Sequence, residues 1–337
     1  MSEVHDVSIV ERSNPSPRTD QRKSPLVQFV IRFPTLILLV LLVVVFSFAS
    51  PQFLTSANLT SVISTQAVVT IVTFAAILPL VVGEFDLSLG YLLGFSAVVG
   101  GHFSGQGWNA AAVIGVMLVT GLIVGLINGI LTVRFGVSGF IGTLGIGIIL
   151  SGLVTAISGG EVLYSGIPDD VISIGRGEFL GLGVSLWLTL IIAALLVYLY
   201  EHTPLGRRWY AVGGSERVAF LAGIRTGRVK ILAFVAAGLL VGVAAVFQLG
   251  QAGAASPSFG PEVLLPAYAG AFLGVVSYRP GYFNVPGALI AVALLAVGFN
   301  GLSLLGVPTW GQPVFNGVVL LIAVLTARAE SRRLKVG

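Results

Sequence analysis

Long runs of apolar residues alternate with short polar connections along most of the 337-residue chain. The run over residues 36–46 contains no polar side chain at all. A helix of roughly 20 apolar residues, rising ~1.5 Å per residue, matches the ~30 Å hydrocarbon core of a bilayer. The pattern therefore predicts an all-α, polytopic membrane protein of about ten transmembrane helices, near residues 29–49, 59–82, 86–104, 110–133, 138–158, 183–200, 230–250, 264–277, 284–304 and 310–327.

The basic residues predict how these helices are oriented. Short cytoplasmic loops retain Lys and Arg. If the ten runs cross the membrane in alternate directions, every one of the 18 Lys and Arg residues except Arg176 falls on the same side. Removing or adding one internal helix would move several basic loops to the opposite side. We therefore expect an even number of helices, with the N-terminus and the C-terminus both in the cytoplasm.

The polar ends of the chain divide it into three parts. Residues 1–28 are rich in Ser, Pro, Asp and Arg and have too little apolar surface for a core, which predicts a disordered cytoplasmic tail. Residues 29–328 are the predicted transmembrane domain, and residues 329–337 a second cytoplasmic tail. Ala49 and Ser50 resemble a signal-peptide cleavage site, but the apolar run before them is long for a signal peptide and further runs follow.

Composition excludes several kinds of chemistry. The chain is 55% hydrophobic and only 9% charged, whereas a soluble domain has about 25% charged residues. It contains no Cys, and its three His residues have no metal-ligand spacing, so we expect neither disulfides nor a metal site. The net charge of +4 follows from the basic cytoplasmic loops. Because no soluble basic module is present, we expect no nucleic-acid partner.

Two acidic residues interrupt the apolar pattern. Glu84 and Asp86 are the only acidic residues between Arg32 and Arg134. A charge at membrane depth is costly, about 2.5–3.5 kcal/mol on insertion scales, so it is usually paired, in water or functional. Asp86 or Ser88 has the chemistry to cap the helix that follows, and a direct role in transport is the alternative. The sequence leaves both interpretations open.

Amide side chains also recur within the apolar runs, at Gln66, Asn128, Gln248, Asn300 and Asn316. Such residues commonly form hydrogen bonds between membrane helices. Amides and hydroxyls also recognise hydroxyl-rich solutes, so a path lined by them is the functional alternative. Asn128-Gly129 and Asn300-Gly301 form a short similarity between the two halves of the chain, too brief to establish a repeat.

The 44 glycines are about twice the average frequency, and many lie within the apolar runs. Small residues at three- and four-residue spacing let membrane helices approach closely. Tight packing is the plain interpretation of these positions. The additional functional interpretation is that thin glycine contacts let helices slide or tilt, as alternating access requires.

The inner loop, residues 201–229, carries most of the internal charge. Ser215 is a suitable N-cap for a short helix over residues 216–221, and Gly223 is suited to end it. A helix of this kind on the cytoplasmic side is suited to docking a partner protein. An ordinary solvated loop is the alternative.

The inner loop resembles the coupling segment of the ribose-type ABC permease family, whose pattern is Thr-x-x-Gly-Arg, then Ala-x-Gly-Gly-Asn, then Ala-Ala and Gly-Ile. Further similar motifs follow in order over residues 86–90, 128–129, 140–145, 279–287 and 301–308. The resemblance covers the chain from about residue 80 onwards. Ser215 stands where the family usually has Asn, and Glu84 and Phe85 stand where Gly and Ile are common.

The resemblance implies the permease subunit of an ATP-driven ABC importer in the bacterial inner membrane, which forms the path for a monosaccharide or similar polyol. The implied partners are two cytoplasmic ATPase subunits, a second permease subunit as homodimer or heterodimer, and a periplasmic or extracellular solute-binding protein. The expected ATPase-coupling residues are Thr203, Gly206, Arg207, Gly213, Gly214, Glu216, Ala219 and Gly223. The expected substrate path comprises Asp86, Ser88, Asn128, Phe140, Thr143 and Asn300.

The chain lacks a Gly-x-x-x-x-Gly-Lys-Ser/Thr phosphate-binding loop. We therefore expect that this subunit is not itself an enzyme and binds no cofactor, and that ATP with Mg²⁺ is held and hydrolysed by the partner ATPase. The closest alternative is a related permease for a nucleoside, a branched amino acid or a signalling molecule. An ion-coupled secondary transporter that uses Glu84 and Asp86 is a more distant alternative. An intramembrane enzyme that relies on His102 is the most distant alternative.

Overall fold

The computed structural model describes residues 34–319, 321–322 and 325. The predicted tails, residues 1–28 and 329–337, lie outside the described residues. The long helices are α2 (Pro34–Ala49), α3 (Ser56–Val81), α4 (Leu89–Gly105), α5 (Ala110–Arg134), α6 (Gly139–Ser158), α8 (Val184–His202), α11 (Thr226–Ala252), α12 (Pro261–Ser277) and α13 (Val285–Leu304), and residues 311–319 are also helical. The short elements are α7 (Asp169–Arg176), the antiparallel pair β1 (Glu178–Phe179) and β2 (Leu182–Gly183), α9 (Pro204–Gly214) and α10 (Glu216–Leu221).

A helix lies at each of the ten predicted positions. Within the described residues, six of them, α3, α5, α6, α8, α11 and α13, are long and apolar enough to cross a membrane. The chain is therefore a mostly helical, multi-pass membrane protein. That all ten helices cross, and that both ends lie in the cytoplasm, stay predictions.

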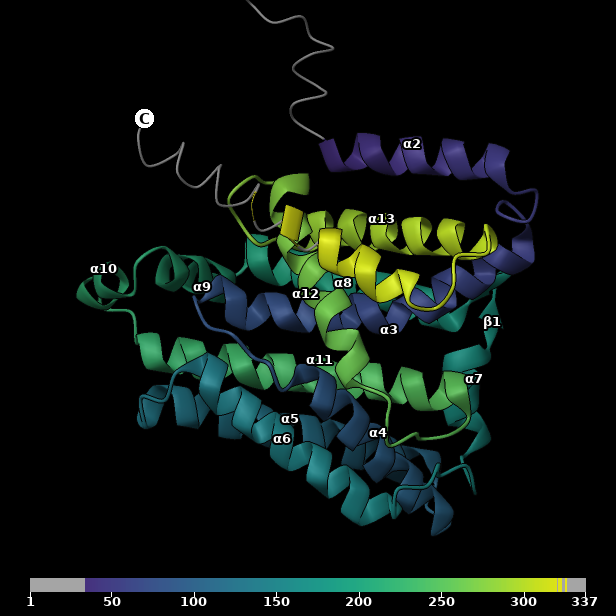
Figure 1. The fold of residues 1–337 in the computed structure, drawn as a ribbon. Coiled ribbons are helices and arrows are strands. Elements are labelled where there is room, and N and C mark those ends of the chain that lie inside the picture. Colours follow the sequence, from purple (N-terminus) through teal and green to yellow (C-terminus); the bar gives the residue numbers. More distant parts are fainter. Residues whose placement is uncertain (1–33, 320, 323–324, 326–337) are drawn as a thin grey trace, which may run out of the picture.

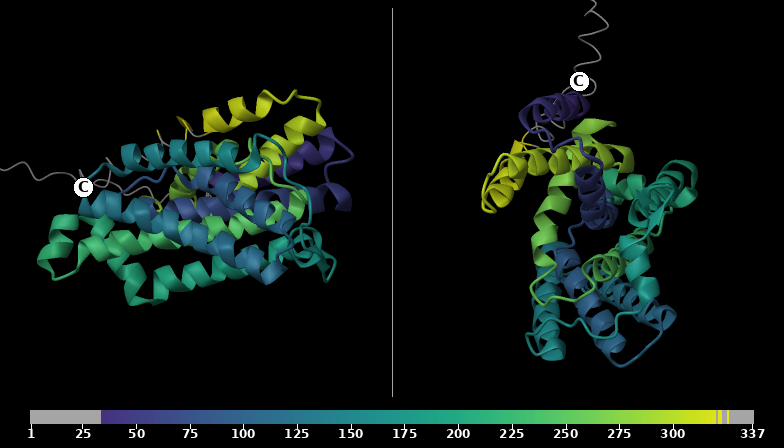
Figure 2. Two further views of the ribbon diagram at one scale, coloured as in Figure 1. Left: turned by 90° about the horizontal axis from the view of Figure 1, so that it is seen from below. Right: turned by 90° about the vertical axis from the view of Figure 1, so that its right-hand side faces the viewer.

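The long helices form a bundle with two distinct ends. Figure 1 shows α9 and α10 at one end and α7 with the β1–β2 hairpin at the other. The helices α2 and α13 lie on one side, α5 and α6 on the opposite side, and α3 and α11 between them (Figure 1, Figure 2). Apart from Arg176, the basic residues of the described chain gather at the α9–α10 end, which agrees with the sides assigned from the sequence.

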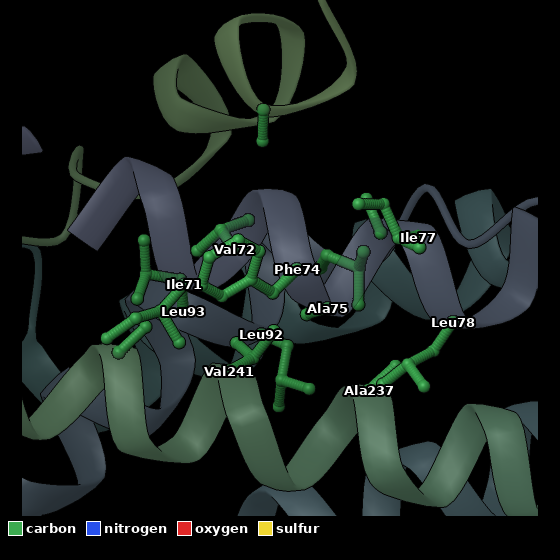
Figure 3. Packing of buried hydrophobic residues seen from close by; sticks show 14 of the residues in the cluster. Ile71, Val72, Phe74, Ala75, Ile77, Leu78, Leu92, Leu93, Ala237 and Val241 are labelled. Carbon is green, nitrogen blue, oxygen red and sulfur yellow. The ribbon is translucent and has the colours of Figure 1, made fainter. Parts of the chain in front are cut away.

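The core lies where α3, α4 and α11 meet. Figure 3 shows Ile71 and Phe74 of α3, Leu92 of α4 and Val241 of α11 packed together, each at most 1% exposed. Lipid tails are as apolar as these side chains, so close packing rather than transfer from water holds such helices together. The second half of α3 is buried almost continuously, over residues 67–81, and it is therefore the central helix.

Two of the helices begin inside the bundle instead of at its ends. After α3 ends, residues 82–88 return into the interior before α4 begins, and residues 253–260 do the same between α11 and α12 (Figure 1). The second returning segment meets the first turns of α4, because a Cβ on Gly94 would overlap the carbonyl oxygen of Phe259. Gly260 has φ +130°, a conformation that residues with a side chain rarely adopt. Short helices that begin at membrane depth are typical of transporters.

Arg176, the basic residue that falls on the opposite side, has a structural explanation. Its Nε donates to the carbonyl of Gln251 at 2.7 Å and its Nη2 to the carbonyl of Ala252 at 2.8 Å. These carbonyls end α11, where the helix leaves acceptors without partners and carries partial negative charge. Arg176 therefore caps α11 at the α7 end of the bundle.

The helices α5 and α11 touch through glycines. A Cβ on Gly121 would overlap the Gly238 carbonyl oxygen, and a Cβ on Gly238 would overlap the Gly121 carbonyl oxygen. Neither backbone can yield without separating the two helices. Gly115, on the same helix as Gly121, has nothing within 4 Å of such a Cβ.

We expect Gly121→Val to destabilise the protein by at least about 1–3 kcal/mol, the usual cost of overpacking. Gly115→Val is the matched control and should change stability little. Thermal unfolding of both variants in detergent measures the difference. Equal melting temperatures for the two variants would contradict the packing of α5 on α11.

Candidate functional site

Asp86 is the centre of a buried polar cluster within the segment that precedes α4. Its side chain is 1% exposed. Its Oδ1 accepts hydrogen bonds from the Ser88 amide at 3.0 Å and the Ser88 hydroxyl at 2.6 Å. Asn128 of α5 donates from Nδ2 to Asp86 Oδ2 at 3.2 Å and to Ser88 Oγ at 2.8 Å. Hydrogen bonds of this kind let a carboxylate remain buried.

The backbone of the same segment is held by two further helices. The Tyr268 hydroxyl of α12 accepts from the Asp86 amide at 3.0 Å and donates to the Asp86 carbonyl at 2.9 Å. The Leu87 amide donates to Thr143 Oγ1 of α6 at 2.8 Å. The segment of residues 82–88 is thus joined to α5, α6 and α12, although none of its own backbone is helical. Tyr268 is a member of this site that the sequence analysis did not identify.

Ser88 occupies the N-cap position of α4, but its side chain forms no capping hydrogen bond there. Its hydroxyl is directed to Asp86 instead. Simple capping therefore does not account for these two residues. The structure assigns them to a network that joins three helices.

The aromatic ring of Phe85 adds an apolar contact beside this network. It stacks on Tyr268 with a centroid distance of 6.1 Å and meets Phe140 edge to face at 6.5 Å. Five of the six residues predicted for the substrate path therefore gather around one segment. The sixth, Asn300, lies elsewhere and exchanges two amide hydrogen bonds of 2.9 Å with Asn58.

A cavity of about 760 Å³ lies among α3, α11, α12, α13 and residues 309–317. None of the six residues predicted for the path lines it. Three of the amides noted in the sequence, Gln66, Gln248 and Asn316, do line it. The other polar lining residues are Thr65, Gln251, Glu262, Thr309 and Gln312, and Phe259 and Phe299 supply aromatic surface.

Most amides of this cavity have unused hydrogen-bonding capacity. The side chains of Gln66, Gln248, Gln312 and Asn316 form no hydrogen bond with any other described residue, whereas Gln251 donates to the carbonyl of Ser64. Among the described residues, the cavity lining contains one acidic residue, Glu262, and no Lys, Arg or His. A neutral solute rich in hydroxyl groups would satisfy these amide donors and acceptors without bringing a further charge into the cavity.

The inner loop contains two helices. Ser215 caps α10 through Val218, at 3.4 Å from Oγ to the amide nitrogen, and Gly223 follows the helix with φ +81°, as the sequence predicted. The sequence analysis missed α9. Two residues indicate the start of α9 in the sequence: Thr203, which caps the helix, and Pro204, which occupies its first position.

One face of α9 packs against the bundle. Gly206, Trp209 and Val212 are buried, and the Trp209 Nε1 donates to the Val229 carbonyl at 3.1 Å. A Cβ on Gly213 would overlap the carbonyl oxygen of Val81, the last residue of α3. The helix α9 therefore contacts the point from which the segment of residues 82–88 departs.

Tyr210 connects α9 to the loop before α13. Its hydroxyl donates to the Phe283 carbonyl at 2.8 Å. Burial raises the pKa of Tyr210, while nearby Arg279 lowers that pKa and Glu201 raises it further. The phenol therefore stays protonated at neutral pH and remains a donor.

The helix α10 presents apolar side chains outward. Val218, Phe220 and Leu221 are 64%, 67% and 77% exposed, whereas Ala219 is buried. Glu216 contacts Lys230, and Arg207 and Gly214 are exposed. The eight predicted coupling residues therefore all lie on or beside α9 and α10, and their coupling role stays a prediction.

We expect Asn128→Leu to destabilise the protein by at least about 3 kcal/mol, because it leaves the buried Asp86 carboxylate without its partner in α5. Asn300→Leu removes a neutral and partly exposed amide pair, and about 1 kcal/mol is expected. Thermal unfolding of the purified variants measures both. An Asn128 variant as stable as the Asn300 variant would contradict the buried network.

We expect Gly213→Leu to destabilise the packing of α9 on α3 by about 1–3 kcal/mol, because the side chain would collide with a backbone carbonyl. The adjacent Gly214 has nothing within 4 Å of an added Cβ, so Gly214→Leu is the matched control. Limited proteolysis of the inner loop and thermal unfolding compare the two. Equal protection of both variants would show that α9 is not packed as described.

Comparison with known proteins identifies the family. The family model described as the branched-chain amino acid transport system / permease component matches residues 58–324. The ribose import permease protein of Bacillus subtilis (strain 168) is 33% identical over 297 residues, which cover 87% of this chain and 91% of that protein. The corresponding protein of Escherichia coli (strain K12) is 31% identical over 294 residues, covering 86% and 92%.

The L-arabinose ABC transporter permease protein of Azospirillum brasilense is 28% identical over 319 residues, covering 94% of both chains. No solved structure matches the chain significantly. The resemblance to ribose-type permeases, made from the motifs, is confirmed. The chain belongs to the branched-chain amino acid transport system / permease component family, and sugar import permeases are among its relatives.

Proposed function

We propose that this chain is the permease subunit of an ATP-driven importer and forms the path for a monosaccharide or a similar polyol through the inner membrane. The observation that carries the proposal is the cavity, in which the amide side chains of Gln66, Gln248, Gln312 and Asn316 form no hydrogen bond with any other described residue. The relatives named for ribose and L-arabinose, and a D-allose transport permease of Escherichia coli that is 31% identical over 304 residues, support the solute class.

The cavity also separates the sugar proposal from an amino-acid alternative. An amino acid carries a carboxylate, and the described residues of the cavity lining provide no cationic side chain to pair with it. A neutral polyol needs only donors and acceptors, which Gln66, Gln248 and Asn316 supply. Sequence relatives include an autoinducer 2 import permease of Escherichia coli, 28% identical over 290 residues, so a small hydroxylated signalling molecule belongs to the same chemical class of candidate.

The cavity needs a cover on its open side. Glu262 and Thr309 line it and are exposed. Polar groups of this kind do not face hydrocarbon, because lipid offers them no partners. A second permease subunit on this face, in a homodimer or a heterodimer, would enclose the path and keep these groups in water.

The exposed surface of α10 is the proposed docking site for the ATPase. Val218, Phe220 and Leu221 form an apolar patch at the end of the bundle. This patch lies outside the six described helices that are long and apolar enough to cross a membrane. Exposed apolar patches outside a membrane mark protein interfaces. We assign this end to the cytoplasm because the described basic residues gather there. ATP and Mg²⁺ belong to the ATPase, and the external solute-binding protein to the α7 end.

The test is uptake by the complete transporter in liposomes, with the cognate ATPase and solute-binding protein. Uptake of ribose, L-arabinose or D-allose should require ATP and should stop when the ATPase phosphate-binding lysine is replaced. We expect Gln66→Leu and Gln248→Leu to lower uptake by roughly tenfold or more, which corresponds to the loss of about 1.4 kcal/mol. ATP hydrolysis should persist in both variants.

Gln106→Leu removes an amide outside the cavity and is the control, with unchanged uptake expected. Uptake driven by a proton gradient and stopped by an uncoupler would replace the importer with a secondary transporter. Full uptake by the Gln66 and Gln248 variants would move the path away from this cavity.

A further inference from the structure

We propose that Lys230 is a positioning residue that ties the docking helix α10 to the segment of residues 82–88, so that movement of α10 is transmitted to the Asp86 network. The inference rests on the proposed function, because it requires that the ATPase docks on α10. Lys230 Nζ lies 2.9 Å from Glu84 Oε1 and 2.7 Å from Glu216 Oε2. One ammonium group thus joins three separate elements, α10, α11 and the segment before α4.

The burial of the group distinguishes it from an ordinary surface ion pair. The side chains of Lys230 and Glu84 are 13% and 18% exposed, and that of Glu216 is 50% exposed. Exposed pairs are screened and contribute little to rigidity. A partly buried cation between two carboxylates is screened less than an exposed pair, and its loss leaves both carboxylates without their shared partner.

Glu84 is enclosed on its other side as well. Its Oε2 lies so close to the start of α6 that a Cβ on Gly139 would come within 2.8 Å of it. The N-terminus of a helix favours negative charge. Glu84 is therefore fixed between Lys230 and α6, and it cannot swing freely when α10 moves.

The connection continues from Glu84 to the interior. Asp86, two residues further along, is bonded through its side chain to Asn128 and through its backbone to Tyr268. A displacement of Glu84 must therefore act on α5 and α12. The helix α12 also lines the cavity, through residues 261–266.

A second contact joins the inner loop to the same segment, beside the Lys230–Glu84 ion pair. Gly213 of α9 rests on the carbonyl of Val81, three residues before Glu84. The two inner-loop helices therefore hold the same segment at two places, by backbone packing through α9 and by charge through α10. Packing alone transmits a push, whereas the Lys230 bridge also transmits a pull, because separating the charges costs energy.

The experiment uses the complete transporter in liposomes and measures the number of solute molecules imported per ATP hydrolysed. We expect Lys230→Met to lower this ratio by roughly 5- to 150-fold, the usual range of coupling between sites, while ATP hydrolysis continues. Lys230→Arg keeps the charge and should restore most of the ratio. Arg134→Met removes a charge at the same end of the bundle from an exposed residue without an ion pair among the described residues, and should leave the ratio unchanged.

Glu216→Gln provides an independent test if Lys230→Met does not accumulate, because Glu216 is half exposed and its loss leaves the Lys230–Glu84 pair in place. We expect the same fall in solute per ATP. The double variant Glu84→Gln with Lys230→Met should be no worse than Lys230→Met alone, since both remove the same connection. An unchanged ratio in Lys230→Met or Glu216→Gln overturns the inference, as does a fall explained entirely by less folded protein.

Failure of the proposed function has a different signature. In that case the wild-type chain would not co-purify with the ATPase, or would import no sugar in the presence of ATP. Failure of the Lys230 inference alone would leave wild-type uptake and ATPase binding intact, and only the response of the variants would differ.

Discussion

The constraint on which the structure depends is the absence of water around its backbone. In hydrocarbon every N–H and C=O must find a partner within the protein, which favours unbroken helices. The segment of residues 82–88 departs from this rule and persists because Tyr268 satisfies the backbone of Asp86 at both its amide and its carbonyl, and Thr143 satisfies Leu87. The same side chains fix where α4 begins, and so determine how α4 meets the returning segment at Phe259. The position of the cavity follows from this meeting, since Phe259 is part of its lining.

The polar residues of the interior serve two different purposes, distinguished by whether their side-chain amide groups already donate hydrogen bonds within the protein. Asn128 is fully buried and donates to Asp86 and Ser88, so it belongs to the scaffold. Gln66 and Gln248 are only half-buried and have no partner among the described residues. An amide without a partner inside an apolar bundle is unfavourable unless water or a solute reaches it. We therefore propose that the solute contacts the amides of the cavity, whereas the Asp86 network holds the surrounding helices in place.

The sequence predicted the features that depend on neighbouring residues. Apolar runs located a helix at each of ten positions, and Ser215 and Gly223 correctly bounded α10. It missed α9, whose first-turn signal in Thr203 and Pro204 was available. It placed Asn128, and not Gln248, in the expected substrate path. Both are amides in apolar runs, and only contacts with distant residues distinguish them. Tyr268 lies 182 residues from Asp86 along the chain, and no local pattern predicts that pairing.

The elements on the two sides of the inner loop occur in the same order. A 26-residue helix, a returning segment, a 17-residue helix and another long helix occur in α3–α5. A 27-residue helix, a returning segment, a 17-residue helix and a long helix occur again in α11–α13. The first helix of the first set, α3, runs toward the α9–α10 end, whereas the first helix of the second set, α11, runs away from it (Figure 1). Two sets of opposite direction are the arrangement of inverted repeats in transporters. Asn128-Gly129 and Asn300-Gly301 fall in the third helix of each set, which gives the short sequence similarity a structural basis. The inner loop lies between the sets and contacts both, the first at Val81 and the second at Lys230, which is the arrangement that the proposed coupling through Lys230 requires.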